Sequence, residues 1–330
     1  MFKSLTVFQA TAPSGLDFTS IEDAFKQSAF VPGGAQQEKS AGWAPPRGSE
    51  HDAYLEAIAG HWLAVLKIET RSVPATELKK RVDAMAQTVE DETGRKPGRK
   101  HLKELKEDAL AQLLPNAFAK TVSVPVWIDP QNGTFGIGST TQSKLDEVVT
   151  ALVRCVPNLS LAEAAQRGKT VAAMREWLMQ EDDEQMPTGM SLGTECVLRH
   201  DAEGKATARF TNQDLACEEV RQNLRSGKEP IALGLCWGER VELVLQASGR
   251  LKGIHVSADT GSEAGEKDVG ELDADFALFT GEMVPVIEQL RQEVEQVSKR
   301  IESARGASDA AIKGIASMWG AGQGVAEAAA

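Results

Sequence analysis

The stretch Gly94–Phe118 limits the possible folds of this chain more than any other segment. Residues 94–98 combine glycine and proline and predict a turn, and Pro115 ends the helical pattern that follows, because proline lacks a backbone donor. A second helical pattern covers 75–92, after Pro74. Two helices joined by a short turn form an antiparallel hairpin. Its second helix carries one apolar stripe at helical spacing, made of Leu102, Leu105, Ala109 and Leu113.

Strand patterns flank this hairpin on both sides. Alternating apolar residues predict strands at 53–59 and 61–70 before it. After it, strands at 121–129 and 133–139 are joined by an Asn-Gly turn, and Pro125 predicts an edge position. The hairpin is therefore an insertion between strands, and we expect it to project from the body of the protein because it buries only one stripe.

The hairpin also concentrates positive charge in an acidic chain. Between Arg95 and Lys106 a single acid, Glu104, accompanies the basic residues, which gives a local charge of +5. The chain carries −12, so the other residues sum to −17. The basic row lies about a third of a turn from the apolar stripe. We therefore assign the candidate DNA-binding residues to this face: Arg95, Lys96, Arg99, Lys100, Lys103 and Lys106.

Cations at helical spacing can contact successive phosphates but cannot by themselves distinguish bases. No recognition-helix, zinc-finger or RNA-stacking motif accompanies them in the sequence. The prediction is backbone binding with little sequence preference. The alternatives are an ordinary solvated helix face, or a protein-interaction module whose basic hairpin docks an acidic protein partner.

The remaining segments predict an α+β chain. Residues 2–9 form a strand, and Thr19 or Ser20 caps a helix. A Gly/Pro-rich loop covers 31–52, in which Trp43 either holds the loop in place or only fills a core niche. Helices at 141–155, 171–179 and 214–225 and strands at 195–200, 205–210, 230–237, 241–247 and 251–256 follow. A long helix over 274–301, interrupted near Gly281 and Pro285, precedes an Ala/Gly-rich flexible tail.

These patterns divide the chain into six regions. They are a first central sheet region, the hairpin, a second central region, an α+β base, a long C-terminal helix and the flexible tail, at 1–74, 75–115, 116–188, 189–272, 273–303 and 304–330.

Catalytic and cofactor motifs are absent from the sequence. The cysteines Cys155, Cys196, Cys217 and Cys236 are widely spaced, which predicts buried, reduced thiols rather than a zinc site or disulfides. The histidines show no metal-binding spacing. Gly168–Thr170 has Glu163 where a phosphate-binding loop needs glycine, and Gly136–Gly138 lacks the third glycine of a dinucleotide loop. We therefore expect no enzyme, no cofactor and no metal.

The sequence also bears on location. It contains no apolar run long enough to cross a membrane, and the N-terminal residues lack the apolar core of a signal peptide. A cytoplasmic protein is the expectation.

Several segments, in order and spacing, resemble the RdgC family of bacterial recombination-associated proteins over about residues 1–303. They are AGWAPPRGS at 41–49, GRKPGRKHLKELKEDAL at 94–110, LLPNAFAK at 113–120, VWID at 126–129, IALGLCW at 231–237, GRLKGI at 249–254 and LDADFALFTGEM at 272–283. The resemblance implies a non-enzymatic, double-stranded DNA-binding protein of the cytoplasm and nucleoid. Its horseshoe-shaped subunit, with mixed or antiparallel sheets and a helical hairpin tip, would pair into a homodimeric ring around DNA and limit access of the RecA recombinase.

Carried over by position, Arg95, Lys96 and Arg99 match basic tip residues that line the hole of the ring. Phe118 matches a phenylalanine that helps close the dimer interface, although an ordinary core aromatic is the alternative. Asn116 stands where a basic residue can occur, and residues 97–98 interrupt the basic run. These departures affect the number of phosphate contacts rather than the fold.

Overall fold

The structure, a computed structural model, describes residues 2–10, 16–180, 186–200, 206–257 and 269–323. The chain forms two compact units, and each is described by itself. The hairpin unit contains residues 8–162, and the C-terminal unit contains residues 1–7 and 163–330. The sequence patterns instead predict the nearest boundary between regions at residues 188 and 189. Residues 163–188 join the C-terminal unit because α5 (Arg167–Met179) packs on strand β10 (Glu229–Trp237) and helix α7 (Val269–Gln323). This packing buries Met174, Trp177 and Leu178.

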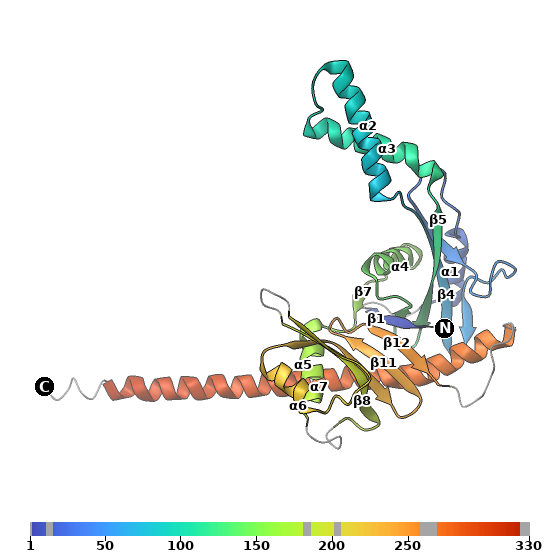
Figure 1. Cartoon of the computed structure of the whole chain (residues 1–330). Helices are drawn as coiled ribbons and strands as arrows, with labels where there is room; N and C mark the ends of the chain where they lie inside the picture. The colour runs from blue at the N-terminus through green and yellow to red at the C-terminus, as the bar shows by residue number, and fades with distance from the viewer. Residues whose placement is uncertain (1, 11–15, 181–185, 201–205, 258–268, 324–330) are drawn as a thin grey trace. The chain divides into compact units, whose positions relative to one another are not determined.

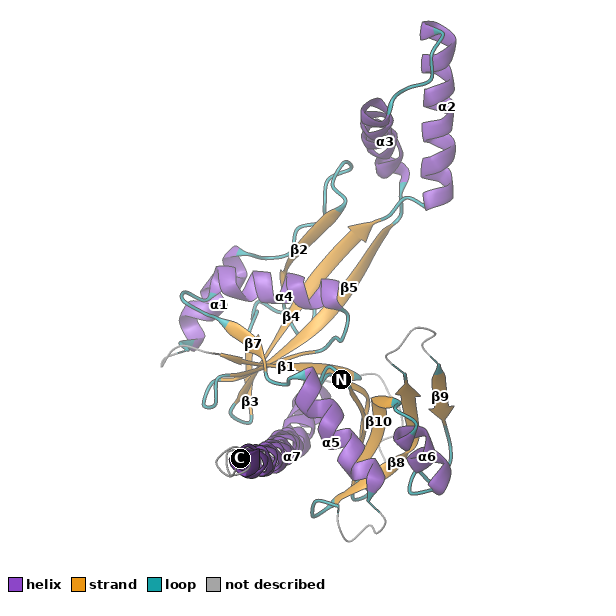
Figure 2. Ribbon diagram, turned by 90° about the vertical axis from the view of Figure 1, so that its left-hand side faces the viewer, coloured by secondary structure: helices purple, strands orange, loops and turns teal. Residues whose placement is uncertain are grey.

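The hairpin unit is an antiparallel sheet with helices on it. Its strands pair in the order β2-β4-β5-β6, with β3 on β4. The strands are β2 (Lys39–Ala44), β3 (Glu56–Ile58), β4 (His61–Arg71), β5 (Ala119–Asp129) and β6 (Thr134–Ile137). Helices α1 (Phe18–Gln27) and α4 (Gln142–Cys155) pack on the sheet and share its core through Phe25, Leu145 and Leu152 (Figure 2).

Trp43 shows where the sequence prediction of a loop over 31–52 is wrong. β2 occupies the middle of that stretch, and the Trp43 ring is 1% exposed and stacks on Phe25 with centroids 3.8 Å apart. The Trp43 backbone exchanges hydrogen bonds with Ser28 and Phe30. Gly42 lies within this strand because the Phe30 backbone approaches it closely. A Cβ at Gly42 would lie 2.5 Å from the Phe30 backbone.

The first helix begins earlier than the sequence predicts. Asp17 is the N-cap of α1, and its carboxylate accepts a hydrogen bond of 2.8 Å from the Ser20 backbone N–H. The Ser20 hydroxyl, which donates to the same carboxylate at 2.6 Å, and this backbone bond lower the pKa of Asp17. Thr19 and Ser20, the predicted caps, lie inside the helix because the aspartate reaches the free amides first.

Pro125 is not on an outer strand, because β5 lies between β4 and β6. The physical reason for the edge prediction nevertheless applies locally. Gly138 donates to the Pro125 carbonyl at 2.8 Å, but Pro125 has no N–H to return, and the β5–β6 ladder ends at Val126.

The C-terminal unit is a second antiparallel arrangement. Its sheet runs in the order β1-β12-β11-β10-β8-β9. The strands are β1 (Ser4–Ala10), β8 (Met190–Arg199), β9 (Thr207–Phe210), β10 (Glu229–Trp237), β11 (Val241–Gln246) and β12 (Leu251–Val256). The unit boundary falls inside β1 and inside the short strand β7 (Leu161–Glu163). Helix α6 (Glu218–Arg225) contacts α5.

Helix α7 (Val269–Gln323) is longer than predicted. It passes through Gly281 and Pro285, so the expected interruption is wrong. It also continues to Gln323, whereas the sequence predicts a helix end at 303 and a flexible tail over 304–330. Residues 324–330 of that tail lie outside the described residues. The helix continues into this segment because alanine has a high helix propensity.

The described chain is therefore a mixed α+β protein with antiparallel strand pairing and seven α-helices. Among the described residues, no helix is both long and apolar enough to cross a membrane.

Candidate nucleic-acid interface

The predicted helical hairpin is present between β4 and β5. It consists of α2 (Ala75–Thr93) and α3 (Arg99–Leu113), followed by the 3-10 turn η1 (Leu114–Asn116). Gly94 ends α2 in the left-handed region, with φ 68°, and its N–H donates to the Glu90 carbonyl at 2.8 Å. In the hairpin unit the two helices extend beyond the ends of β4 and β5 (Figure 1).

The apolar contact between the two helices is small. On α3, Leu105 is 6% exposed and Ala109 is fully buried, whereas α2 contains no buried residue. Leu102 is 39% exposed, so the predicted apolar stripe is not buried along its whole length. It lies on the first turn of α3, where no third element covers the helices. A hydrogen bond of 3.0 Å from Arg81 Nε to Gln112 Oε1 adds a polar link between α2 and α3.

All the predicted basic residues are exposed. Lys103 lies 3.9 Å from Glu107, but both side chains are mostly exposed, so this pair neutralises little. Within the described parts of the chain, no ion pair involves the other members of the group, Arg95, Lys96, Arg99, Lys100 and Lys106. Their positive charges are therefore available to an anionic ligand.

The first turn of α3 adds to the uncompensated positive charge. Gly98 is the N-cap and provides no side-chain hydrogen bond, and no acid occurs in the turn. Arg99 and Lys100 thus stand at the positive end of the helix dipole, which costs stability without a nearby anion. A phosphate at this end would relieve the repulsion.

The exposed cations of α2 lie near its start, at Lys79, Lys80 and Arg81, whereas those of the turn and α3 lie at the other end of the hairpin. Glu90, Asp91 and Glu92 occupy the last turn of α2 and make that end acidic. Along α3, the row of Arg99, Lys103 and Lys106 spans about 10 Å at 1.5 Å per residue. The hairpin therefore presents one cationic edge rather than a uniformly basic tip.

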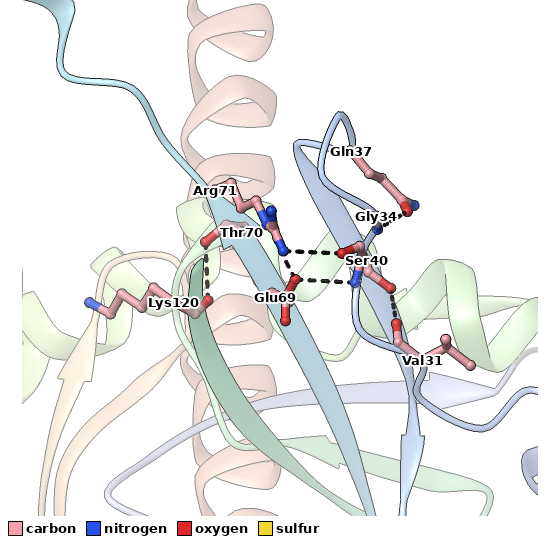
Figure 3. A network of polar contacts seen from close by, with 9 residues as sticks. Val31, Gly34, Gln37, Ser40, Glu69, Thr70, Arg71 and Lys120 are labelled. Atoms are coloured by element: carbon pink, nitrogen blue, oxygen red, sulfur yellow. Dashed lines mark hydrogen bonds and ion pairs between the residues drawn. The ribbon is translucent and has the colours of Figure 1, made fainter. Parts of the chain in front are cut away.

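A polar network holds the root of the hairpin (Figure 3). Glu69 is 7% exposed and accepts a hydrogen bond of 3.1 Å from the Gly33 N–H, and Arg71 Nη2 donates to the Gly33 carbonyl at 3.1 Å. The Arg71 backbone N–H also donates to the Glu38 backbone carbonyl at 2.8 Å. These contacts tie loop 31–38 to the last residues of β4 before α2. Sequence reasoning missed them, because partners 36 and 38 positions apart leave no local signal.

Phe118 lies between η1 and β5 and is 95% exposed. The alternative that it is an ordinary core aromatic is therefore wrong. A fully exposed phenylalanine is free to contact another surface, but a single exposed apolar residue does not by itself mark one. Its role in a dimer interface remains a prediction.

Other sites considered from the sequence have structural explanations. A Cβ at Gly138 would lie 2.6 Å from Pro125 Cγ, so this glycine permits strand packing rather than nucleotide binding. Glu163 forms an ion pair of 2.7 Å with Arg250. Burial raises the pKa of the Cys196 thiol to about 12. Cys155 is also buried, but Cys217 and Cys236 are only half-buried, contrary to prediction. The described residues contain no group of three or more His, Cys, Asp or Glu able to hold a metal.

Comparison with known proteins identifies the family. A family model described as "Putative exonuclease, RdgC" matches residues 1–297. A protein of Cupriavidus pinatubonensis named Recombination-associated protein RdgC is 33% identical over 295 residues, covering 88% of this chain and 97% of its own length. Similar proteins of the same name occur in Dechloromonas aromatica, 31% identical over 88% of this chain and 95% of its own, and in Herminiimonas arsenicoxydans, 31% identical over 90% and 99%. The chain belongs to the RdgC family.

Proposed function

We propose that this protein binds double-stranded DNA through the cations of the turn and α3, without catalysing a reaction and with little sequence preference. The observation that carries the proposal is the row of exposed, uncompensated cations in a chain of net charge −12. Phosphates follow one another by about 3.4 Å of helix rise per strand, so a row of about 10 Å can contact several of them. Acidic surface elsewhere opposes nonspecific contacts and directs DNA to the hairpin.

The proposal includes a homodimeric ring. Membership in the RdgC family and the exposed side chain of Phe118 support pairing of two horseshoe-shaped subunits, with the hairpins as tips. A two-fold axis would place two cationic hairpins on one DNA duplex. The printed names of the relatives refer to recombination. By covering duplex DNA, the ring would limit access of the RecA recombinase in the nucleoid.

Retention on closed circular and linear duplex of equal length tests encirclement. After binding at low salt, a high-salt wash removes protein held only by phosphate contacts. A closed ring should remain on the circle and slide off the free ends of the linear molecule. Equal loss from both DNA forms would contradict a ring while leaving surface binding intact.

A nuclease assay on the same linear DNA addresses the word exonuclease in the family description. Incubation with Mg²⁺ or Mn²⁺ should leave the length of the DNA unchanged. The protein is first purified free of contaminating nucleases. Progressive shortening of the DNA by this protein would then contradict the non-enzymatic proposal and indicate a nuclease.

A further inference from the structure

Strand β5 has a free backbone edge next to the hairpin. β5 pairs with β4 from Ala119 to Ile128, but β6 pairs with β5 only from Val126 to Asp129. Beyond β6 the edge receives, from the residues that the structure describes, one backbone bond, in which the Gly138 N–H donates to the Pro125 carbonyl at 2.8 Å. Figure 2 shows β5 as the outermost strand of its sheet where it approaches the hairpin.

The direction of the backbone groups along this edge follows from that bond. The Pro125 carbonyl points away from β4, and groups alternate along an antiparallel ladder without register shifts. The N–H and C=O groups of Ala119, Thr121 and Ser123 therefore point to the free side. All three side chains are exposed. Unpaired edge groups of this kind are a template for another strand.

We propose that the β5 edges of two copies of this chain pair antiparallel about a two-fold axis at Thr121. Thr121 then lies opposite Thr121 of the second copy, and Ala119 lies opposite Ser123. Each of these pairs exchanges its outward N–H and C=O groups. The inference rests on the proposed homodimer and specifies how the two copies meet.

Side chains favour this register over its neighbours. Because outward groups must face outward groups, the register can shift only so that the axis moves by a whole residue, to residue 120 or 122. An axis at Lys120 would place two lysines directly opposite each other, which is unfavourable. An axis at Val122 would place Ala119 opposite Pro125, which has no N–H to donate.

With the axis at Thr121, apolar and charged side chains are compatible across the edge. Lys120 lies opposite Val122 of the second copy, so no like charges meet. Phe118, which is 95% exposed, precedes the paired residues and stands across from the position of Val124, whose side chain is 1% exposed and already covered by its own subunit. Pro125 falls just beyond the paired residues. The pairing would thus satisfy the free edge and place Phe118 beside the interface.

Site-specific disulfide formation tests the register. In a hydrogen-bonded antiparallel pair the Cα atoms are about 5.5 Å apart, within disulfide range. Thr121→Cys should therefore form a dimer of twice the 35.4 kDa chain mass on mild oxidation, reversed by reductant. Ser123→Cys is the matched control, because its copies would be roughly 13 Å apart along the ladder. Unmutated protein gives the background from the native cysteines.

The oligomeric state of the unmutated protein separates the two proposals. A dimer in sedimentation, crosslinking through Thr121→Cys and none above background through Ser123→Cys support the edge pairing. A dimer that does not crosslink at Thr121→Cys, or that crosslinks as well at Ser123→Cys, overturns the pairing and leaves the homodimer standing. A monomer at all concentrations overturns both. Both positions are exposed, so the variants should fold, and a circular dichroism spectrum matching the unmutated protein checks this.

Discussion

Helices α3 and α7 both carry exposed cations, but their charges are compensated differently. On α7, Arg291 lies 2.8 Å from Glu288, Lys299 lies 4.0 Å from Glu295, and Arg300 pairs with Glu176 of α5. Lys169 of α5 lies 2.7 Å from Glu295 and lowers the pKa of that carboxyl. On α3, only Lys103 has a carboxylate within ion-pair distance among the described residues.

The difference shows that a count of lysines and arginines does not identify a binding surface. Arg300 of α7 pairs with a glutamate of α5, and Arg291 and Lys299 each have a glutamate of α7 itself within ion-pair distance. The α3 cations repel one another at a helix N-terminus and gain stability only when an anion approaches. Uncompensated charge, rather than charge alone, distinguishes the two helices. The predictions below test this distinction.

The largest effect is expected from reversing the charge of the hairpin. Changing Arg95, Lys96, Arg99 and Lys103 to Glu should abolish duplex binding, because four attractive phosphate contacts become repulsive. Fluorescence anisotropy with a labelled duplex measures the affinity, and sedimentation should show an unchanged oligomer. Unchanged affinity would contradict the assignment of DNA binding to the hairpin and favour an acidic protein as its partner.

Removing the exposed aromatic should weaken the oligomer without unfolding the subunit. Phe118→Ala deletes a ring that is 95% exposed, so the free energy of unfolding should change by less than about 0.5 kcal/mol. The dimer should dissociate at lower dilution in sedimentation equilibrium, and retention on circular DNA should fall. A variant that dissociates and retains DNA like the unmutated protein would place the interface elsewhere.

Truncating the small hairpin core should loosen the hairpin alone. Leu105→Ala removes a side chain that is 6% exposed and should cost about 2 kcal/mol or more of local stability. Leu102→Ala, four-tenths exposed on the same helix, is the matched control and should cost about 0.5 kcal/mol or less. Amide hydrogen exchange within 75–113 measures both. Equal protection in the two variants would show that Leu105 does not hold the helices together.

Much of this fold follows from local patterns in the sequence. The apolar stripe, the glycine turn and Pro115 predict the hairpin, and the observed ends of α2 and α3 lie within one residue of the predicted ones. The Asn-Gly turn likewise places the β5–β6 connection. These features depend on neighbours a few residues apart, which a single sequence displays directly.

Features that depend on distant partners were not predictable in the same way. The strand at Trp43 forms because Phe25 and the Phe30 backbone lie against it. The position of Leu102 inside the apolar stripe does not reveal that nothing covers its turn. For the candidate site, composition located the cations on α3, but only the structure shows which cations elsewhere already have carboxylate partners.

The salt dependence of duplex affinity tests the contrast between α3 and α7 most directly. If about six phosphates are neutralised, the slope of log affinity against log salt should be roughly −5. Replacing Arg99 and Lys106 of α3 by Gln should make that slope shallower by about 2, because each lost contact contributes about 0.9. Replacing Arg291 and Arg300 of α7 by Gln, an equal change in net charge, should leave the slope unchanged. Equal slopes for the two double variants would contradict the assignment of DNA binding to the uncompensated cations of the hairpin.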